Sequence, residues 1–105
     1  MVTSGQLALA AAAQRLSNAY GGASLGNGVN PAQDLPYRQV LLYAESADAF
    51  VGADSLVTST IHGIKVDSAE NLPVSIGPFP DGGIKLSDLW VAGASATLHF
   101  LGIVF

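Results

Sequence analysis

A serine between two glycines fits a catalytic motif in this sequence. Residues 22–26 read G-A-S-L-G and match G-x-S-x-G, the turn that presents a hydrolase serine between a strand and a helix. Here the match lies in a stretch rich in glycine and asparagine, with neither element beside it. A chain of 105 residues is also too short for the fold that uses this turn. We therefore interpret Ser24 as a loop residue.

Metal binding, phosphate binding and acid–base catalysis find no support in the spacing of the other side chains. His62 and His99 are the only histidines, neither has a partner at H-x-x-x-H spacing, and there is no cysteine. Residues 77–82 have P-loop spacing, but Gly83 stands where the lysine is needed. The acidic residues form neither a calcium loop nor a catalytic pair: Asp54, Asp67, Glu70, Asp81 and Asp88. We expect no catalytic, metal or cofactor site and no enzyme activity.

The composition favours protein partners over nucleic acid or membranes. Hydrophobic residues make up 50% of the chain, charged residues only 11%, and the net charge is −4. This charge disfavours nucleic acid and anionic membrane surfaces, and no run approaches the roughly 20 apolar residues of a membrane span. The apolar run at residues 7–13 has no basic residue before it, so we expect no secretory signal. With so few charges, part of the surface should be apolar and meet other proteins.

Short apolar runs separated by turn residues predict an all-β domain. The runs have the length of strands, and turn clusters such as Asp81–Gly83 lie between them. This spacing is typical of a small β-sandwich or β-barrel, which is the fold class that we predict. The expected strands are residues 38–44, 49–52, 61–66, 72–76, 88–92 and 97–105, and Pro73 favours an edge position for the fourth.

The N-terminal segment is ambiguous between helix and strand. Alanines at residues 8 and 10–13 favour a helix, whereas residues 6–10 alternate, with Leu7 and Leu9 on one face. The all-β context favours a strand. Glycine, asparagine and proline crowd residues 21–36, so we predict a flexible N-terminal arm and Gly-rich linker over residues 1–36 and a β-domain over residues 37–105.

Two places in the strands are candidates for subunit contacts. Trp90 lies in an apolar strand and should be core or interface. The last strand carries apolar residues on both sides, so it should be central or buried between subunits, with His99 on the face opposite Leu98 and Phe100. The candidate interface residues are Leu7, Leu9, Trp90, His99, Leu101, Ile103 and Phe105.

The order of motifs from Tyr37 to Phe105 resembles a family of viral proteins. An apolar strand at residues 38–44 is followed by Phe50–Val51–Gly52, then Val57–Thr58 and the turn glycine Gly63. Leu89–Trp90–Val91–Ala92 and a closing apolar strand complete the order. This pattern is similar to that of small structural proteins of tailed bacteriophages, some of which are capsid decoration, or cement, proteins.

The resemblance implies a virion structural protein without an active site. Its implied role is to stabilise the phage head by bridging subunits of the major capsid protein, as a homotrimer on the capsid surface after synthesis in the host cytoplasm. The resemblance leaves open a small tail, baseplate or host-glycan-binding module of the virion as the alternative. Neither nucleic acid nor membrane is an expected partner.

Overall fold

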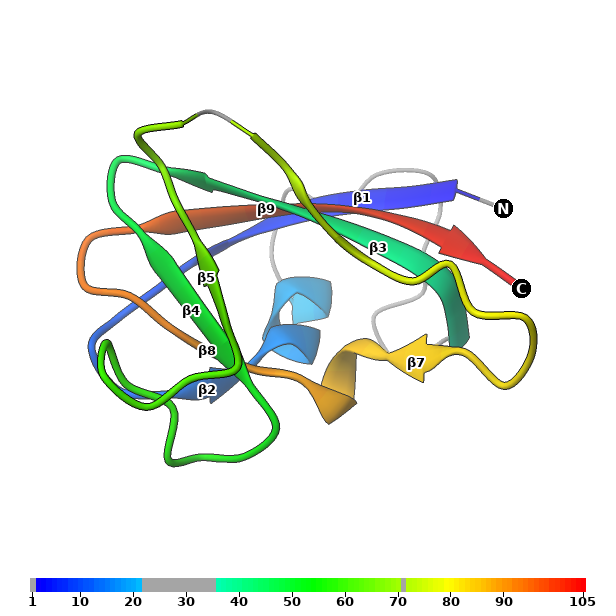
Figure 1. Ribbon diagram of the computed structural model, residues 1–105, viewed down its shortest axis with the longest axis horizontal. Helices are drawn as coiled ribbons and strands as arrows, with labels where there is room; N and C mark the ends of the chain where they lie inside the picture. The colour runs from blue at the N-terminus through cyan, green and yellow to red at the C-terminus, as the bar shows by residue number, and fades with distance from the viewer. Residues whose placement is uncertain (1, 22–35, 71) are drawn as a thin grey trace.

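Two antiparallel sheets pack against each other in this chain, and the computed structural model describes residues 2–21, 36–70 and 72–105 (Figure 1). Sheet A has the strand order β1-β9-β3-β6, with β7 also paired to β3, and sheet B has the order β2-β8-β4-β5. The prediction of an all-β sandwich is confirmed. The strands are β1 (Val2–Ala8), β2 (Gln14–Arg15), β3 (Pro36–Glu45), β4 (Ala49–Gly52), β5 (Ile64–Val66), β6 (Val74–Ile76), β7 (Ile84–Lys85), β8 (Trp90–Ala92) and β9 (Thr97–Val104), and two 3-10 helices are η1 (Leu16–Gly21) and η2 (Leu86–Asp88).

The last strand, β9, is central in sheet A, as its two-sided apolar pattern predicts. It pairs with β1 on one side and with β3 on the other. Leu98 and Phe100 are buried on its inner face, whereas Leu101 on the outer face is 42% exposed. The apolar residues on one face of β9 therefore lie inside the sandwich, and those on the other face lie at the surface.

The described part of the N-terminal segment is a strand inside the domain, which differs from the arm that we expected. All seven residues of β1 pair with β9, from Val2 opposite Ile103 to Ala8 opposite Thr97. Leu9 continues from β1 into the core, and its backbone N–H donates to the carbonyl of Ala96 at 2.8 Å. The prediction of a strand rather than a helix at residues 6–10 is confirmed, although β1 begins earlier, at Val2, and ends at Ala8. Residues 22–35, most of the expected linker, lie outside the described residues.

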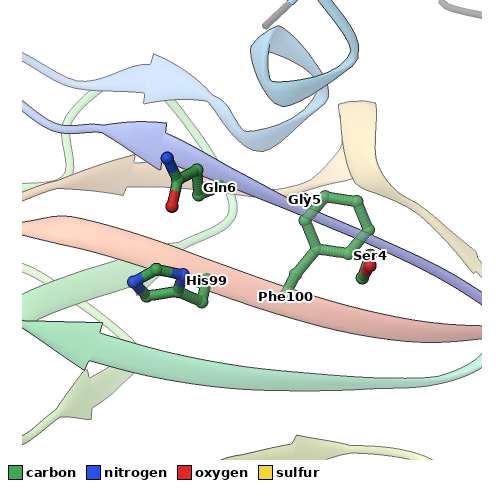
Figure 2. Close-up of a pocket in the computed structure, with 5 residues that line it drawn as sticks. All are labelled: Ser4, Gly5, Gln6, His99 and Phe100. Carbon is green, nitrogen blue, oxygen red and sulfur yellow. The ribbon is translucent and has the colours of Figure 1, made fainter. Parts of the chain in front are cut away.

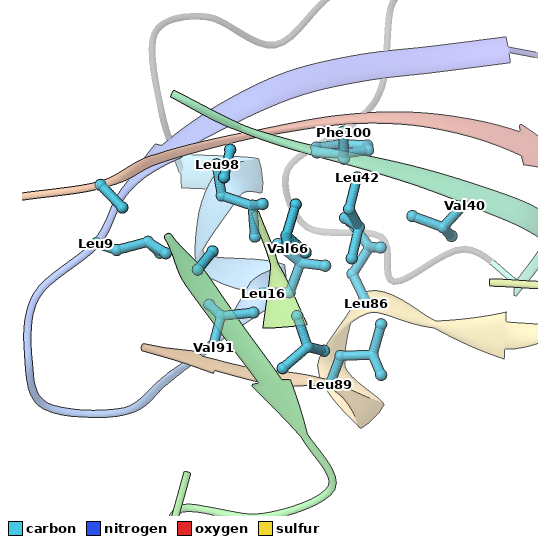
Figure 3. Close-up of a cluster of buried hydrophobic side chains, with 14 of the residues drawn as sticks. Leu9, Leu16, Val40, Leu42, Val66, Leu86, Leu89, Val91, Leu98 and Phe100 are labelled. Carbon is cyan, nitrogen blue, oxygen red and sulfur yellow. The ribbon is translucent and has the colours of Figure 1, made fainter. Parts of the chain in front are cut away.

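The core lies between the two sheets and is closed at one side by the two 3-10 helices (Figure 3). Leu16 of η1 and Leu86 of η2 are fully buried beside the strand residues. Tyr37 is also fully buried, with its ring edge-on to Phe100 and against Gly102, where any β-carbon would collide with the ring. Besides Tyr37, the strand residues of the core are Val40, Leu42, Ala44, Ala49, Val51, Val66, Val91, Leu98 and Phe100.

The smallest elements were not predicted. β2 and β7 have two residues each, too short for an alternation to be read from the sequence. The first pairs with β8 and the second with β3, so both depend on contacts that are remote in the chain. The edge position expected near Pro73 is confirmed, because β6 ends the path of sheet A and begins directly after this proline.

Candidate protein interface

The outer face of sheet A carries a cluster of apolar side chains that point away from sheet B. We define this outer face by Leu41 and Tyr43 of β3 and by His99, Leu101 and Ile103 of β9. Leu41 lies opposite Leu101 and Tyr43 lies opposite His99 in the strand register, so these pairs share one side of the sheet. Exposed apolar side chains gathered in this way are typical of a surface that contacts another protein.

An open depression of about 300 Å³ lies on the outer face. Its walls are almost entirely apolar, because among the described residues that line it only His99 and Tyr43 have polar side chains. An apolar side chain from a partner would lose its contact with water there without leaving a polar group unpaired. The lining residues are Leu41, Leu42, Tyr43, Pro73, His99, Phe100 and Leu101.

His99 lies at the junction of this depression with a second one of about 260 Å³, which Ser4, Gly5, Gln6, His99 and Phe100 line (Figure 2). Its ring lies 6.0 Å from that of Tyr43, and Nε2 lies 3.9 Å from a carboxylate oxygen of Glu45. Within the described residues, Nε2 is the one buried side-chain polar atom that has no hydrogen-bond partner. The Glu45 carboxylate is beyond hydrogen-bond distance, so burial of Nε2 carries an uncompensated cost.

The other predicted interface residues lie in different places. Leu9 is buried in the core, and Leu7 is partly buried and packs against the core. Trp90 is half-buried on sheet B, with the guanidinium carbon of Arg15 5.2 Å from its ring centroid, and is not a core residue. Phe105 is 43% exposed and has Arg38 5.0 Å from its ring centroid. His99, Leu101 and Ile103 thus share one surface, Leu7, Leu9 and Trp90 lie elsewhere, and Phe105 follows the end of β9.

Several carboxylates are hydrogen-bond acceptors for nearby backbone N–H groups. Asp54 accepts from Leu56 and Asp67 from Ala69, each at 2.9 Å, and Asp88 accepts from Lys85 at 3.0 Å. Such bonds are typical of turns and helix starts. The described residues contain no group of three or more potential metal ligands. Ser24 lies outside the described residues.

Asp48 is a structural carboxylate that the sequence did not single out. The backbone N–H of Ser68 donates to its Oδ1 at 2.9 Å, and this bond is the main cause that lowers the pKa of Asp48 below its usual value. The hydroxyl of Ser68 and the ammonium of Lys65, 3.5 Å from Oδ2, act in the same direction. Asp48 therefore ties the turn before β4 to the end of β5.

The loop between β4 and β5, residues 53–62, is a second surface that the sequence did not indicate. Val57 is only 3% exposed, whereas its neighbour Leu56 is 67% exposed and Ile61 is 60% exposed. Val57 packs against Gly52, where a β-carbon would collide with a methyl group of this valine. Anchored by Val57, the loop presents two large aliphatic side chains to solvent.

The contact between Gly52 and Val57 gives a testable stability difference. Gly52→Ala is expected to lower the free energy of unfolding by about 1–3 kcal/mol, because the new methyl group overpacks the site and displaces Val57. Gly63→Ala is the matched control, since a β-carbon there meets only the carbonyl oxygen of Val51 at 3.5 Å. Urea unfolding of both variants measures the difference, and equal midpoints would show that Val57 does not anchor the loop through Gly52.

Comparisons with family models, with curated proteins and with solved structures find no match to this chain. In the part of the chain that the structure describes, no helix has the length and apolarity to cross a membrane.

Proposed function

We propose that this protein is a structural protein of a tailed-phage virion, a capsid decoration protein that stabilises the head by bridging subunits of the major capsid protein. It acts as a homotrimer on the capsid surface after synthesis in the host cytoplasm. The motif order from Tyr37 to Phe105 supports this role through its resemblance to such proteins. The observation that carries the proposal is the exposed apolar outer face of sheet A, around Leu101.

The outer face has an apolar centre and a polar border, as specific protein interfaces do. Leu41, Leu101 and Ile103 supply an apolar centre, and Gln39 with its hydrogen-bond partner Ser75 lies at the border, 2.8 Å from side chain to side chain. A buried apolar centre with a polar rim is typical of specific protein contacts. Bridging requires more than one contact surface, and a homotrimer carries three copies of the outer face.

Leu101→Asp is expected to weaken binding to preassembled empty capsid shells at least tenfold. An aspartate in place of Leu101 would bring an unpaired charge into a contact that excludes water, and this costs more than the ~1.4 kcal/mol that corresponds to a tenfold change. Co-sedimentation of the purified protein with shells, over a range of concentrations, measures the dissociation constant. Leu101→Thr should weaken binding in the same direction while keeping a side chain that favours strands.

Asn18→Asp is the matched control, because it adds the same charge at an exposed position on η1, outside the outer face. It should bind shells like the unchanged protein, and thermal melts establish that all variants are folded. Unchanged binding by folded Leu101→Asp would remove the outer face from the shell contact. If the unchanged protein fails to bind shells, the capsid proposal is wrong, and isolated tails and baseplates are the next binding partners to test.

A further inference from the structure

We propose that the peptide between Asp81 and Gly82 is a site of spontaneous isomerisation, at which the chain converts to an isoaspartyl linkage and loosens β7. Both residues are exposed and lie in the turn before β7, at the border of the molecule (Figure 1). Neither residue belongs to the outer face of sheet A. The inference therefore goes beyond the proposed function and does not rest on it.

The reaction joins two neighbouring groups of the chain, and water is the only co-reactant. The Gly82 nitrogen gives up its proton and attacks Cγ of the protonated Asp81 carboxyl group. A carbon–nitrogen bond forms, and the carboxyl hydroxyl leaves with a proton as water. Water then adds to the main-chain carbonyl carbon of Asp81 and breaks its bond to the Gly82 nitrogen. The chain now runs through Cβ and Cγ of Asp81, one atom longer, and the former carbonyl is a free carboxylate.

The carboxylate of Asp81 is free to turn towards this nitrogen. Within the part of the chain that the structure describes, it has no hydrogen-bond or ion-pair partner. The other described aspartates are restrained, because each accepts a hydrogen bond from a backbone N–H at 2.9–3.0 Å: Asp48, Asp54, Asp67 and Asp88. Asp81 thus differs from them in its contacts and not only in the residue that follows it.

The peptide group of Gly82 is exposed and polarised. The turn bends at Gly82 with a φ of 71°, and the carbonyl of Asp81 accepts a hydrogen bond from the N–H of Gly83 at 2.7 Å. This is a γ-turn with positive φ, a rare and strained conformation. The bond to the carbonyl polarises the peptide and makes the Gly82 N–H easier to deprotonate. Apart from the chain neighbours of Gly82, no described residue has an atom within 4 Å of where its β-carbon would lie.

The extra backbone atom would act on β7 through Gly83. This glycine lies so close to the carbonyl of Tyr37 and the ring of Phe105 that a β-carbon would collide with both. It therefore has no room to shift towards them. The next residue, Ile84, pairs with Tyr37 of β3, so the longer turn should displace β7 from that strand. Amide hydrogens of residues 84–85 should exchange about tenfold faster or more in the isoaspartyl form, because the local opening becomes easier.

Peptide mapping of the folded protein, aged in mildly acidic buffer, tests the site. Trypsin releases residues 66–85 as one peptide that contains both Asp67 and Asp81. Fragmentation by electron transfer locates isoaspartate within it, and we expect isoaspartate to accumulate at least tenfold faster at Asp81 than at Asp67. In urea Asp67 loses its bond from Ala69, so the ratio of the two rates should fall at least threefold. The Asn27–Gly28 pair lies in another tryptic peptide, residues 16–38, and does not interfere.

Asp81→Glu is the matched control. It keeps the charge and the position, but its additional methylene would require a six-membered ring, which closes far more slowly. This variant should melt like the unchanged protein and give no isomerised linkage at residue 81. Equal rates at Asp67 and Asp81 in the folded protein, or a ratio that does not fall in urea, overturn the inference. Unchanged amide exchange at residues 84–85 in the separated isoaspartyl protein overturns the effect on β7.

Discussion

Deleting residues 1–20 is expected to unfold the domain. The deletion removes β1, which pairs with β9 along its whole length, together with the buried side chains of Leu9 and Leu16. Loss of a buried leucine typically costs about 2–5 kcal/mol, and two of them approach the total of about 5–15 kcal/mol that stabilises a domain. Circular dichroism during heating should show no cooperative transition for the truncated chain.

Smaller changes in the same segment sharpen this test. Leu16→Ala should lower the melting temperature by roughly 10 °C or more, because a fully buried side chain is lost. Asn18→Ala, at an exposed position two residues later, should change the free energy of unfolding by no more than about 0.5 kcal/mol. A truncated chain that melts cooperatively near the temperature of the intact protein would make the N-terminal segment dispensable, as an arm would be.

Removing residues 101–105 is expected to have a comparable effect from the other end of the chain. Residues 101–103 pair with β1 and β3 at once, so the truncation breaks sheet A in its centre. It also uncovers the buried ring of Tyr37, which packs on Gly102. Burial of a side chain of this kind contributes roughly 1.5–3 kcal/mol, before the loss of the strand pairing is counted.

Removal of Phe105 alone is the appropriate control. This residue follows β9, is 43% exposed, and contacts Arg38 at the surface. Its loss should leave a cooperative melt at a slightly lower temperature, whereas the five-residue truncation should show none. If both truncated proteins melt alike and assemble like the intact protein, the end of β9 is peripheral.

The longer strands could be predicted because their patterns are local. Leu98, Phe100 and Leu101 in β9 already show that both sides of the strand are apolar, which predicts a central position or burial between subunits. In the structure β9 is central in sheet A. The two residues of β2 give no such signal, since their strand conformation depends on pairing with β8. The placement of β1 inside the domain depends in the same way on a partner about 90 residues away, and no local pattern contains that information.

Surface features were harder to predict than buried ones. Strand alternation predicts that His99, Leu101, Ile103 and Phe105 share one side of the last strand, and in the structure β9 ends before Phe105, at Val104. Leu56 and Val57 are adjacent aliphatic residues in a loop, where no periodicity tells which one is buried. The choice is made by Gly52 on a neighbouring strand, whose missing side chain leaves room for Val57 alone.

The pairing of β1 with β9 also determines when the fold can be completed in the cell. During synthesis β1 emerges early, but its partner strand is about 90 residues further along the chain, so roughly 5–20 s pass before β9 exists at ordinary elongation rates. Throughout that interval β1, which carries no charged residue, has no β9 to pair with. Sheet A can therefore be completed only after β9 has been synthesised, and until then the inner face of β1 has no β9 side chains such as Leu98 beside it.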